Sequence, residues 1–170
     1  MKEEEQKKIF NGWIKVHSAL LFKIVRAYAF NEVDREELFQ EITIQLWRSI
    51  PSFRGDAAVT TWMYRISLNT ALRWAASEQK HRQGVKPIGE IEHVLMEKPN
   101  QQDERLSWLY EEIAGLHEID RSLTLLLLDG FSYKEMAQML GISESNIGVK
   151  LHRIKKYLID RSKKAKHNGI

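Results

Sequence analysis

The amino-acid sequence predicts an all-α protein made of two small helical domains joined by a flexible linker. Two observations predict the helices: apolar residues recur at steps of three or four along almost every long segment, and no alternating run is long enough for a sheet. A third observation predicts the division, because residues 81–103 form a polar stretch rich in Gly, Pro and other helix-poor residues. We therefore expect one domain at 1–80, a linker at 81–103 and a second domain at 104–170.

Three helices are predicted in the first domain. The first is defined by apolar residues at helical spacing, which are Trp13, Val16, Leu20, Ile24 and Tyr28. Asp34 is expected to cap the second helix, because a side-chain oxygen there can accept from free amide groups of the first turn. The apolar stripe of that helix consists of Leu38, Ile42 and Leu46. Thr60 or Thr61 opens a third helix that continues to about Lys80.

The second domain is predicted to end in a helix–turn–helix. Two helices, at about 105–115 and 120–129, precede it. Ser132 and Glu135 have the spacing of a capping box, Gly141 can supply the left-handed residue of a tight turn, and Ser143 can cap the helix that follows. Small Ala137 suits the close crossing of the two helices.

The last of these helices is the candidate DNA-contacting element. Its inward stripe is Ile147, Leu151, Ile154 and Leu158. A rotation of about 100° per residue then turns another set outward, which is Ser145, Val149, His152, Arg153 and Lys156, with Asn146 and Lys150 on a flank. Polar residues near the start can reach base edges and later cations can meet phosphates. The alternative is an ordinary helical hairpin with a solvated face.

Aromatic and basic residues gather around the third helix of the first domain. They are Phe53, Arg54, Trp62, Tyr64, Arg65, Arg73 and Trp74. Aromatic and arginine planes can stack on unpaired bases, while cations hold phosphates. The alternative is that the aromatic rings anchor the core. On the preceding helix, Glu37, Gln40 and Glu41 share one side with Arg48, which suits either a docking face or a solvated one.

Composition excludes several classes of protein. The chain has no cysteine, its six histidines lack metal-ligand spacing, and no glycine-rich phosphate loop is present, so we expect no catalytic residues, no metal and no cofactor. The charged N-terminus lacks a signal-peptide core and no apolar run could span a bilayer, so a cytoplasmic location without direct membrane insertion is expected.

Charge is unevenly distributed along the chain. Residues 121–170 contain 10 Lys/Arg and 4 Asp/Glu, which suggests a polyanionic partner. The alternative is a solvated tail, because Arg161–Lys166 holds four of those cations.

Three segments, in order, resemble extracytoplasmic-function (ECF) RNA polymerase sigma factors. Residues 34–48 resemble the polymerase-binding helix of that family, residues 53–69 its −10 promoter region, and residues 116–158 its −35 region. The resemblance covers about residues 13–80 and 105–158. It implies an alternative sigma factor that binds core RNA polymerase, recognises −10 and −35 promoter elements and initiates transcription, and that an anti-sigma factor restrains.

The resemblance also implies roles for individual residues. The surface that binds polymerase would comprise Glu37, Leu38, Gln40 and Glu41. A pocket for a flipped −10 base would draw on Phe53, Ile66 and Asn69, with Ser49 nearby. Trp62, Arg65 and Arg73 are further −10 candidates because of their aromatic and basic side chains. The −35 contacts would include Val149, Lys150, His152 and Arg153. Two departures stand out, because Gly148 replaces the Lys or Arg frequent in the family and His117 replaces a common proline.

Two rival functions remain at this point. A transcriptional regulator with one helix–turn–helix would leave the first 80 residues unexplained. A sigma-like adaptor would bind polymerase without contacting DNA. Promoter-specific initiation with purified core polymerase separates a sigma factor from both.

Overall fold

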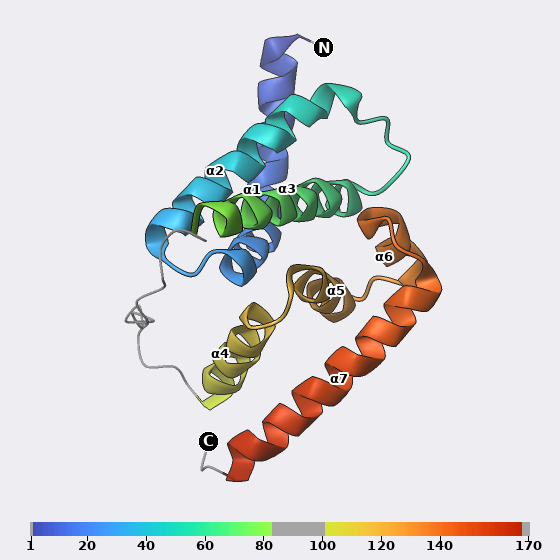
Figure 1. Ribbon diagram of the computed structural model, residues 1–170. Coiled ribbons are helices and arrows are strands. Elements are labelled where there is room, and N and C mark those ends of the chain that lie inside the picture. Colours follow the sequence, from blue (N-terminus) through green and yellow to red (C-terminus); the bar gives the residue numbers. More distant parts are fainter. Residues whose placement is uncertain (1, 83–100, 168–170) are drawn as a thin grey trace. The chain divides into compact units, whose positions relative to one another are not determined.

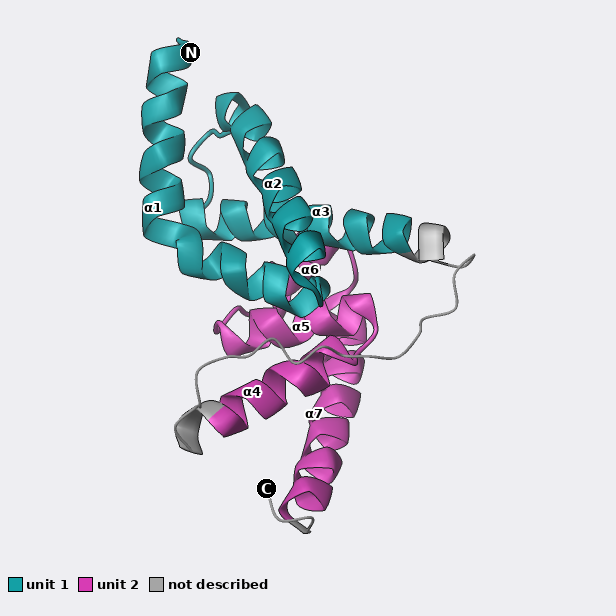
Figure 2. Cartoon of the chain, turned by 90° about the vertical axis from the view of Figure 1, so that its left-hand side faces the viewer, with its two compact units in different colours: residues 1–97 teal, residues 98–170 magenta. Residues whose placement is uncertain are grey.

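The computed structural model describes residues 2–82 and 101–167, with side chains at 2–78 and 104–166. These residues form helices and no strand, in two units that comprise Met1–Glu97 and Lys98–Ile170 (Figures 1 and 2). The all-α prediction with two helical domains is therefore confirmed. The predicted linker lies mostly outside the described residues, and helices cover both of its ends, so the domain boundaries stay a prediction.

The first unit is built from three long helices that pack against one another (Figure 1). They are α1 (Glu3–Tyr28), α2 (Glu32–Ser49) and α3 (Val59–Arg82), with a short 3₁₀ turn, η1 (Ile50–Ser52), after α2. The stripe predicted for the second helix, Leu38, Ile42 and Leu46, is buried. Apolar residues of the other two helices are buried as well: Leu21, Ile24 and Tyr28 on α1, and Met63, Tyr64 and Leu68 on α3. Burying these apolar side chains is the main contribution to the stability of the bundle.

The predicted stripe of α1 is wrong at Val16, whose side chain is 73% exposed. The next residue, His17, has φ −112° and ψ 16°, outside helical values. This local break rotates the first half of α1 relative to the second. Residues on one stripe of an ideal helix therefore do not share one face here.

The second helix starts earlier than predicted. Its N-cap is Asn31, whose side-chain oxygen accepts from the Asp34 N–H at 2.8 Å, while the Asn31 amide donates to the Asp34 carboxylate at 2.7 Å. Asp34 is thus the third residue of the helix and the partner of the cap rather than the cap itself. The third helix likewise begins at Val59, one residue before Thr60.

The second unit contains α4 (Gln101–Ala114), α5 (Glu118–Leu128), α6 (Tyr133–Leu140) and α7 (Glu144–His167). The predicted capping box is present, with Glu135 N–H donating to the Ser132 hydroxyl and the Ser132 N–H donating to the Glu135 carboxylate. Gly141 ends α6 at φ +68°, and the Ser143 hydroxyl caps α7 by accepting from Asn146 N–H. The helix–turn–helix is therefore formed by α6 and α7 as predicted.

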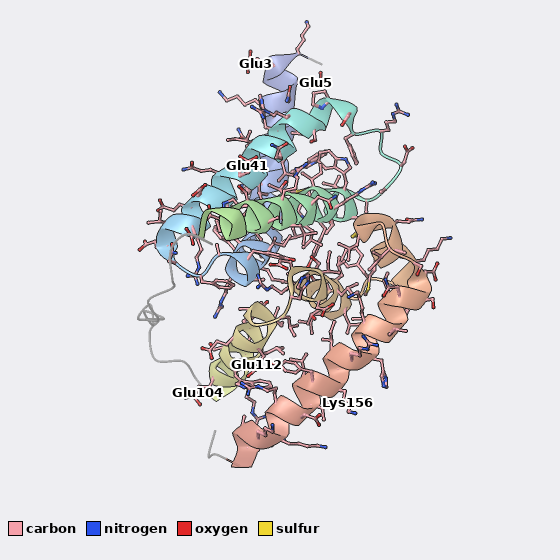
Figure 3. The ribbon with its side chains drawn as sticks, in the orientation of Figure 1. Glu3, Glu5, Glu41, Glu104, Glu112 and Lys156 are labelled. Atoms are coloured by element: carbon pink, nitrogen blue, oxygen red, sulfur yellow. The ribbon has the colours of Figure 1, made fainter. Side chains whose placement is uncertain are left out.

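One buried carboxylate joins α4 to the second half of α7. Glu112, which is 7% exposed, accepts three hydrogen bonds from Arg161 at 2.7–3.0 Å and one from the Tyr157 hydroxyl at 3.2 Å. Figure 3 shows Glu112 on the side of α4 that faces α7. Hydrogen bonds from Arg161 are the largest cause that lowers the pKa of Glu112; burial opposes them, and the Arg161 charge and Tyr157 hydroxyl reinforce them.

We predict that Glu112→Gln lowers the free energy of unfolding of the second unit by about 1–2 kcal/mol near pH 7, since water partly screens the half-exposed arginine. The lowered folded-state pKa means that this stabilisation is complete above the ordinary value of 4.5. It is lost as pH falls through the folded-state pKa. Denaturant unfolding of wild type and variant between neutral and acidic pH measures the difference.

Glu111→Gln, at the exposed neighbouring position, is the matched control and should change little. A difference between wild type and Glu112→Gln that stays constant down to strongly acidic pH would contradict the charge-dependent role of Glu112.

Candidate nucleic-acid and polymerase interfaces

The segment between α2 and α3 is held in place by three aromatic rings. Trp13 on α1, Phe53 after the 3₁₀ turn and Trp62 on α3 lie with ring centroids 5.1–5.4 Å apart, all edge to face. All three side chains are half-buried. Such pairs add to the stability of apolar burial. The rings of Phe53 and Trp62 therefore fasten this segment to two helices. Tyr64, the other residue of the core-anchor alternative, is buried.

Sequence reasoning missed the part that Trp13 plays in this cluster. It placed Trp13 on the core stripe of the first helix and Phe53 in a loop, with no reason to bring them together. The available signal was the presence of aromatic residues on three separate segments, but sequence spacing does not reveal contacts between distant segments.

Five of the residues proposed for −10 contacts lie at helical spacing on one side of α3. They are Trp62, Arg65, Ile66, Asn69 and Arg73. Arg65 is exposed, whereas Ile66 and Asn69 are half-buried. The Asn69 amide makes no hydrogen bond to any residue that the structure describes. Ser49, at the end of α2, donates its hydroxyl to the Gln45 carbonyl at 2.7 Å.

Arg73 stands apart from the other −10 candidates because it lines a hollow between α2 and α3. The hollow has a volume of about 260 Å³ and is lined by Glu37, Glu41, Thr70, Arg73, Trp74 and Ser77. The structure thus brings Arg73 together with two of the predicted polymerase-binding residues. The indole N–H of Trp74, another lining residue, is buried without a partner among the described residues.

The four predicted polymerase-binding residues do not share one environment. Glu37 and Gln40 are exposed and Glu41, labelled in Figure 3, is half-buried and accepts a hydrogen bond from Gln45 at 2.8 Å. Leu38 has no exposed surface. Its side chain supports this face from inside the core, and a partner could not touch it without unfolding the helix.

On α7 the buried and exposed sides are opposite, as the predicted periodicity requires. Ile147, Leu151 and Ile154 are buried. Six of the seven proposed −35 residues are exposed: Ser145, Asn146, Val149, His152, Arg153 and Lys156. Figure 3 shows Lys156 on the side of α7 away from α4. Lys150 differs, because its ammonium group pairs with Asp120 of α5 at 3.4 Å and is one-third exposed.

The two departures from the family pattern fit the backbone. A side chain at Gly148 would first meet the Tyr133 ring, at 3.7 Å from its Cβ, so the site has room for a residue larger than glycine. His117 has φ −60°, the value that a proline would enforce. In the part of the chain with described side chains, no cluster of His, Cys, Asp or Glu could hold a metal, and no described helix could cross a membrane.

Two family models match the chain in the expected order. The model of sigma-70 region 2 matches residues 13–81, and that of sigma-70 region 4 matches residues 106–158. The first match covers the first unit's three helices from the middle of α1 onward. It therefore accounts for the part of the chain that a regulator with a single helix–turn–helix would leave unexplained.

Curated relatives and solved structures are similar to this chain over most of their own length. The ECF RNA polymerase sigma-E factor of Escherichia coli strain K12 is 31% identical over 71% of this chain and 69% of its own, and that of Haemophilus influenzae is 25% identical over 92% and 88%. The structure of sigma factor RpoE in complex with the anti-sigma factor NepR from Bartonella quintana has a TM-score of 0.70 at 19% identity, covering 92% of this chain and 98% of that one.

A second solved structure, of CnrH in complex with the cytosolic domain of CnrY, has a TM-score of 0.62 at 18% identity and covers 91% of this chain and 90% of that one. At these identities the two structures show likeness of fold. The curated relatives and the two regional matches establish that the chain belongs to the ECF sigma factors of the sigma-70 family. Its function is that of an alternative sigma factor, which binds core RNA polymerase at promoters and initiates transcription.

Proposed function

We propose that this sigma factor acts as a non-catalytic cytoplasmic subunit whose two units divide promoter recognition between them. The first unit binds core polymerase and the −10 element, and the second binds the −35 element. The observation that carries the proposal is that α7 has two different sides. A buried apolar stripe packs it into the second unit, and the opposite face exposes six polar, apolar and basic side chains. That arrangement suits insertion into a DNA major groove.

For the −35 element, the exposed residues fall into two chemical groups. Ser145, Asn146 and Val149 near the start of α7 can contact base edges or thymine methyl groups. His152, Arg153 and Lys156 follow and can bind phosphates. Lys150 is already paired with Asp120, so a DNA contact through it would require that partly exposed ion pair to open, at small cost.

For the −10 element, we propose that Ile66 and Asn69 receive a flipped base next to Ser49 and Arg65. The amide of Asn69 can both donate and accept, and it is not engaged by any described residue, which supports a role in binding a base. Phe53 and Trp62 act by holding the segment in position with Trp13. Unstacking a base costs a few kcal/mol, so a site of fixed shape is needed to offset it.

For core polymerase, we propose a surface on α2 made of Glu37, Gln40 and Glu41, with Leu38 supporting it from the core. Arg73 lies at the rim of the same hollow as the two carboxylates, and we place it with this surface rather than with the −10 site. The solved relatives RpoE and CnrH were each captured with a protein partner. By analogy, we propose that an anti-sigma factor also binds this chain.

Asn69→Ala is predicted to change which base is preferred in the −10 element while leaving polymerase binding and melting temperature nearly unchanged. The reason is that the amide has no described partner to lose. Transcription from a panel of −10 variants, paired with thermal unfolding, measures both effects. Asn11→Ala, at an exposed position of α1, is the control.

An opposite result would assign Asn69 to the scaffold. A structural amide should lower stability by about 1–3 kcal/mol when its buried partner is left unsatisfied. If Asn69→Ala melts markedly earlier yet keeps the wild-type order of promoter preference, the base-binding role is wrong.

Arg153→Ala is predicted to weaken binding to −35 duplex DNA. Loss of a phosphate contact should reduce the slope of log affinity against log salt by about one, whereas loss of a base contact should cost roughly 1–3 kcal/mol on the cognate site. Fluorescence anisotropy over a salt series distinguishes the two. Arg105→Ala, which removes an exposed arginine from α4, should leave binding unaltered. Wild-type affinity of Arg153→Ala at every salt concentration would rule out this role.

A further inference from the structure

The last helix continues well past the segment that matches the sigma-70 region 4 model. The match ends at residue 158, whereas α7 extends to His167. We refer to residues 159–167 as the α7 extension. Its three lysines, Lys163, Lys164 and Lys166, are exposed and make no ion pair with any residue that the structure describes. A solvated tail, the alternative raised by the sequence, would not need to be helical.

The extension is ordered by a specific interaction. Arg161 lies on the inner side of α7 and is held by Glu112, which also accepts from Tyr157 one turn earlier. Of the four cations in residues 161–166, Arg161 is therefore neutralised by the protein itself. The three lysines are not, and three like charges within four residues of one helix repel one another. The Glu112 interaction offsets this repulsion and the ordering cost.

Helical geometry aligns the extension with the proposed DNA-binding face. Lys163 follows Lys156 by seven residues, which places it on nearly the same line and about 10 Å farther along the axis. Lys164 follows Arg153 by eleven residues, also on nearly the same line, about 16 Å farther. A major groove is about 12 Å wide, so a helix whose first turns lie in the groove reaches the bordering phosphates with its later turns.

One acidic residue lies among these cations. Asp160 is exposed between Lys156 and Lys164, four residues from each. It can form helical ion pairs with them, and it would repel a phosphate that approached this face. Asp160 therefore lowers the affinity of this face for a polyanion. Removing its charge is expected to raise that affinity.

We propose that the α7 extension is a second DNA-binding segment, in which Lys163, Lys164 and Lys166 bind phosphates that flank the −35 element without contacting bases. The inference rests on the proposed −35 role of α7. The α7 extension would add affinity that does not depend on DNA sequence, because phosphate contacts position a protein on DNA while base contacts specify the site. Charge complementarity and continuity with Arg153 and Lys156 favour DNA over an acidic protein surface.

The test uses the full-length chain and a fluorescent duplex that carries the −35 element with long or trimmed flanks. The variant replaces Lys163, Lys164 and Lys166 by Gln, which keeps helix propensity. We expect the salt slope to fall by about two to three and affinity to drop roughly tenfold or more at 0.1 M salt. The preference for cognate over scrambled −35 sequence should be unchanged. Trimming one flank should weaken wild type but not the variant.

Two further variants make the result decisive. Replacement of Lys7, Lys8 and Lys15 by Gln makes the same change of net charge on exposed positions of α1 and should leave the slope unaltered. Asp160→Asn should strengthen DNA binding severalfold. If the lysine variant keeps the wild-type slope and flank dependence, or if Asp160→Asn has no effect, the extension does not bind DNA.

The outcomes separate this inference from the proposed function. If Arg153→Ala weakens cognate binding while the lysine variant does not, the −35 assignment stands and the extension proposal is wrong. If the lysine variant binds DNA normally but loses affinity for core polymerase, the extension docks on protein instead, and the proposal is overturned. If wild type shows no −35 preference at all, the −35 assignment itself fails.

Discussion

Burial of one stripe of α7 is the constraint on which the second unit depends. Ile147, Leu151 and Ile154 are enclosed by α5 and α6, and this fixes the rotation of α7 about its own axis. Once that rotation is set, the exposed face is set as well, since residues half a turn away must point outward. The turn at Gly141 and the cap at Ser143 place the start of the helix, and the Glu112–Arg161 interaction holds its end. The packing of α7 in the core therefore also determines which residues form the proposed DNA-binding face.

The first unit differs, because the residues proposed to receive a −10 base lie on α2 and α3, which a segment without α-helix joins. Such a segment has few backbone hydrogen bonds of its own and must be positioned by side chains. The Trp13, Phe53 and Trp62 rings provide this positioning from three parts of the chain. In the proposed site their role is structural, and the Asn69 amide makes no hydrogen bond to any residue that the structure describes. We therefore assign Phe53 and Trp62 to shaping the proposed site rather than to stacking on bases.

Local signals in the sequence predicted most of the second unit. The capping box, the left-handed glycine and the stripe of α7 each depend on residues within a few turns, and all were found where expected. Expectations failed where distant or subtle interactions decide the outcome. Asn31 takes the place of Asp34 as the cap of α2, and Val16 is exposed next to the break at His17. The hydrogen bonds between Glu112 and Arg161 join residues 49 positions apart, which sequence spacing does not reveal. Arg73 shares helical spacing with the −10 candidates, yet only packing of α2 on α3 places it beside Glu37 and Glu41. The roles assigned to individual surface residues stay predictions.

Promoter selection in transcription with purified components tests the central claim most directly. The full-length chain would be mixed with core RNA polymerase on a template library with randomised −10 and −35 positions, and transcript starts would be sequenced. A sigma factor whose two units contact separate elements should enrich two motifs at a fixed spacing upstream of each start, and neither component alone should initiate at them. Initiation that requires no motif, or binding of the chain to polymerase without any promoter-specific starts, would contradict the account and indicate an adaptor that does not contact DNA.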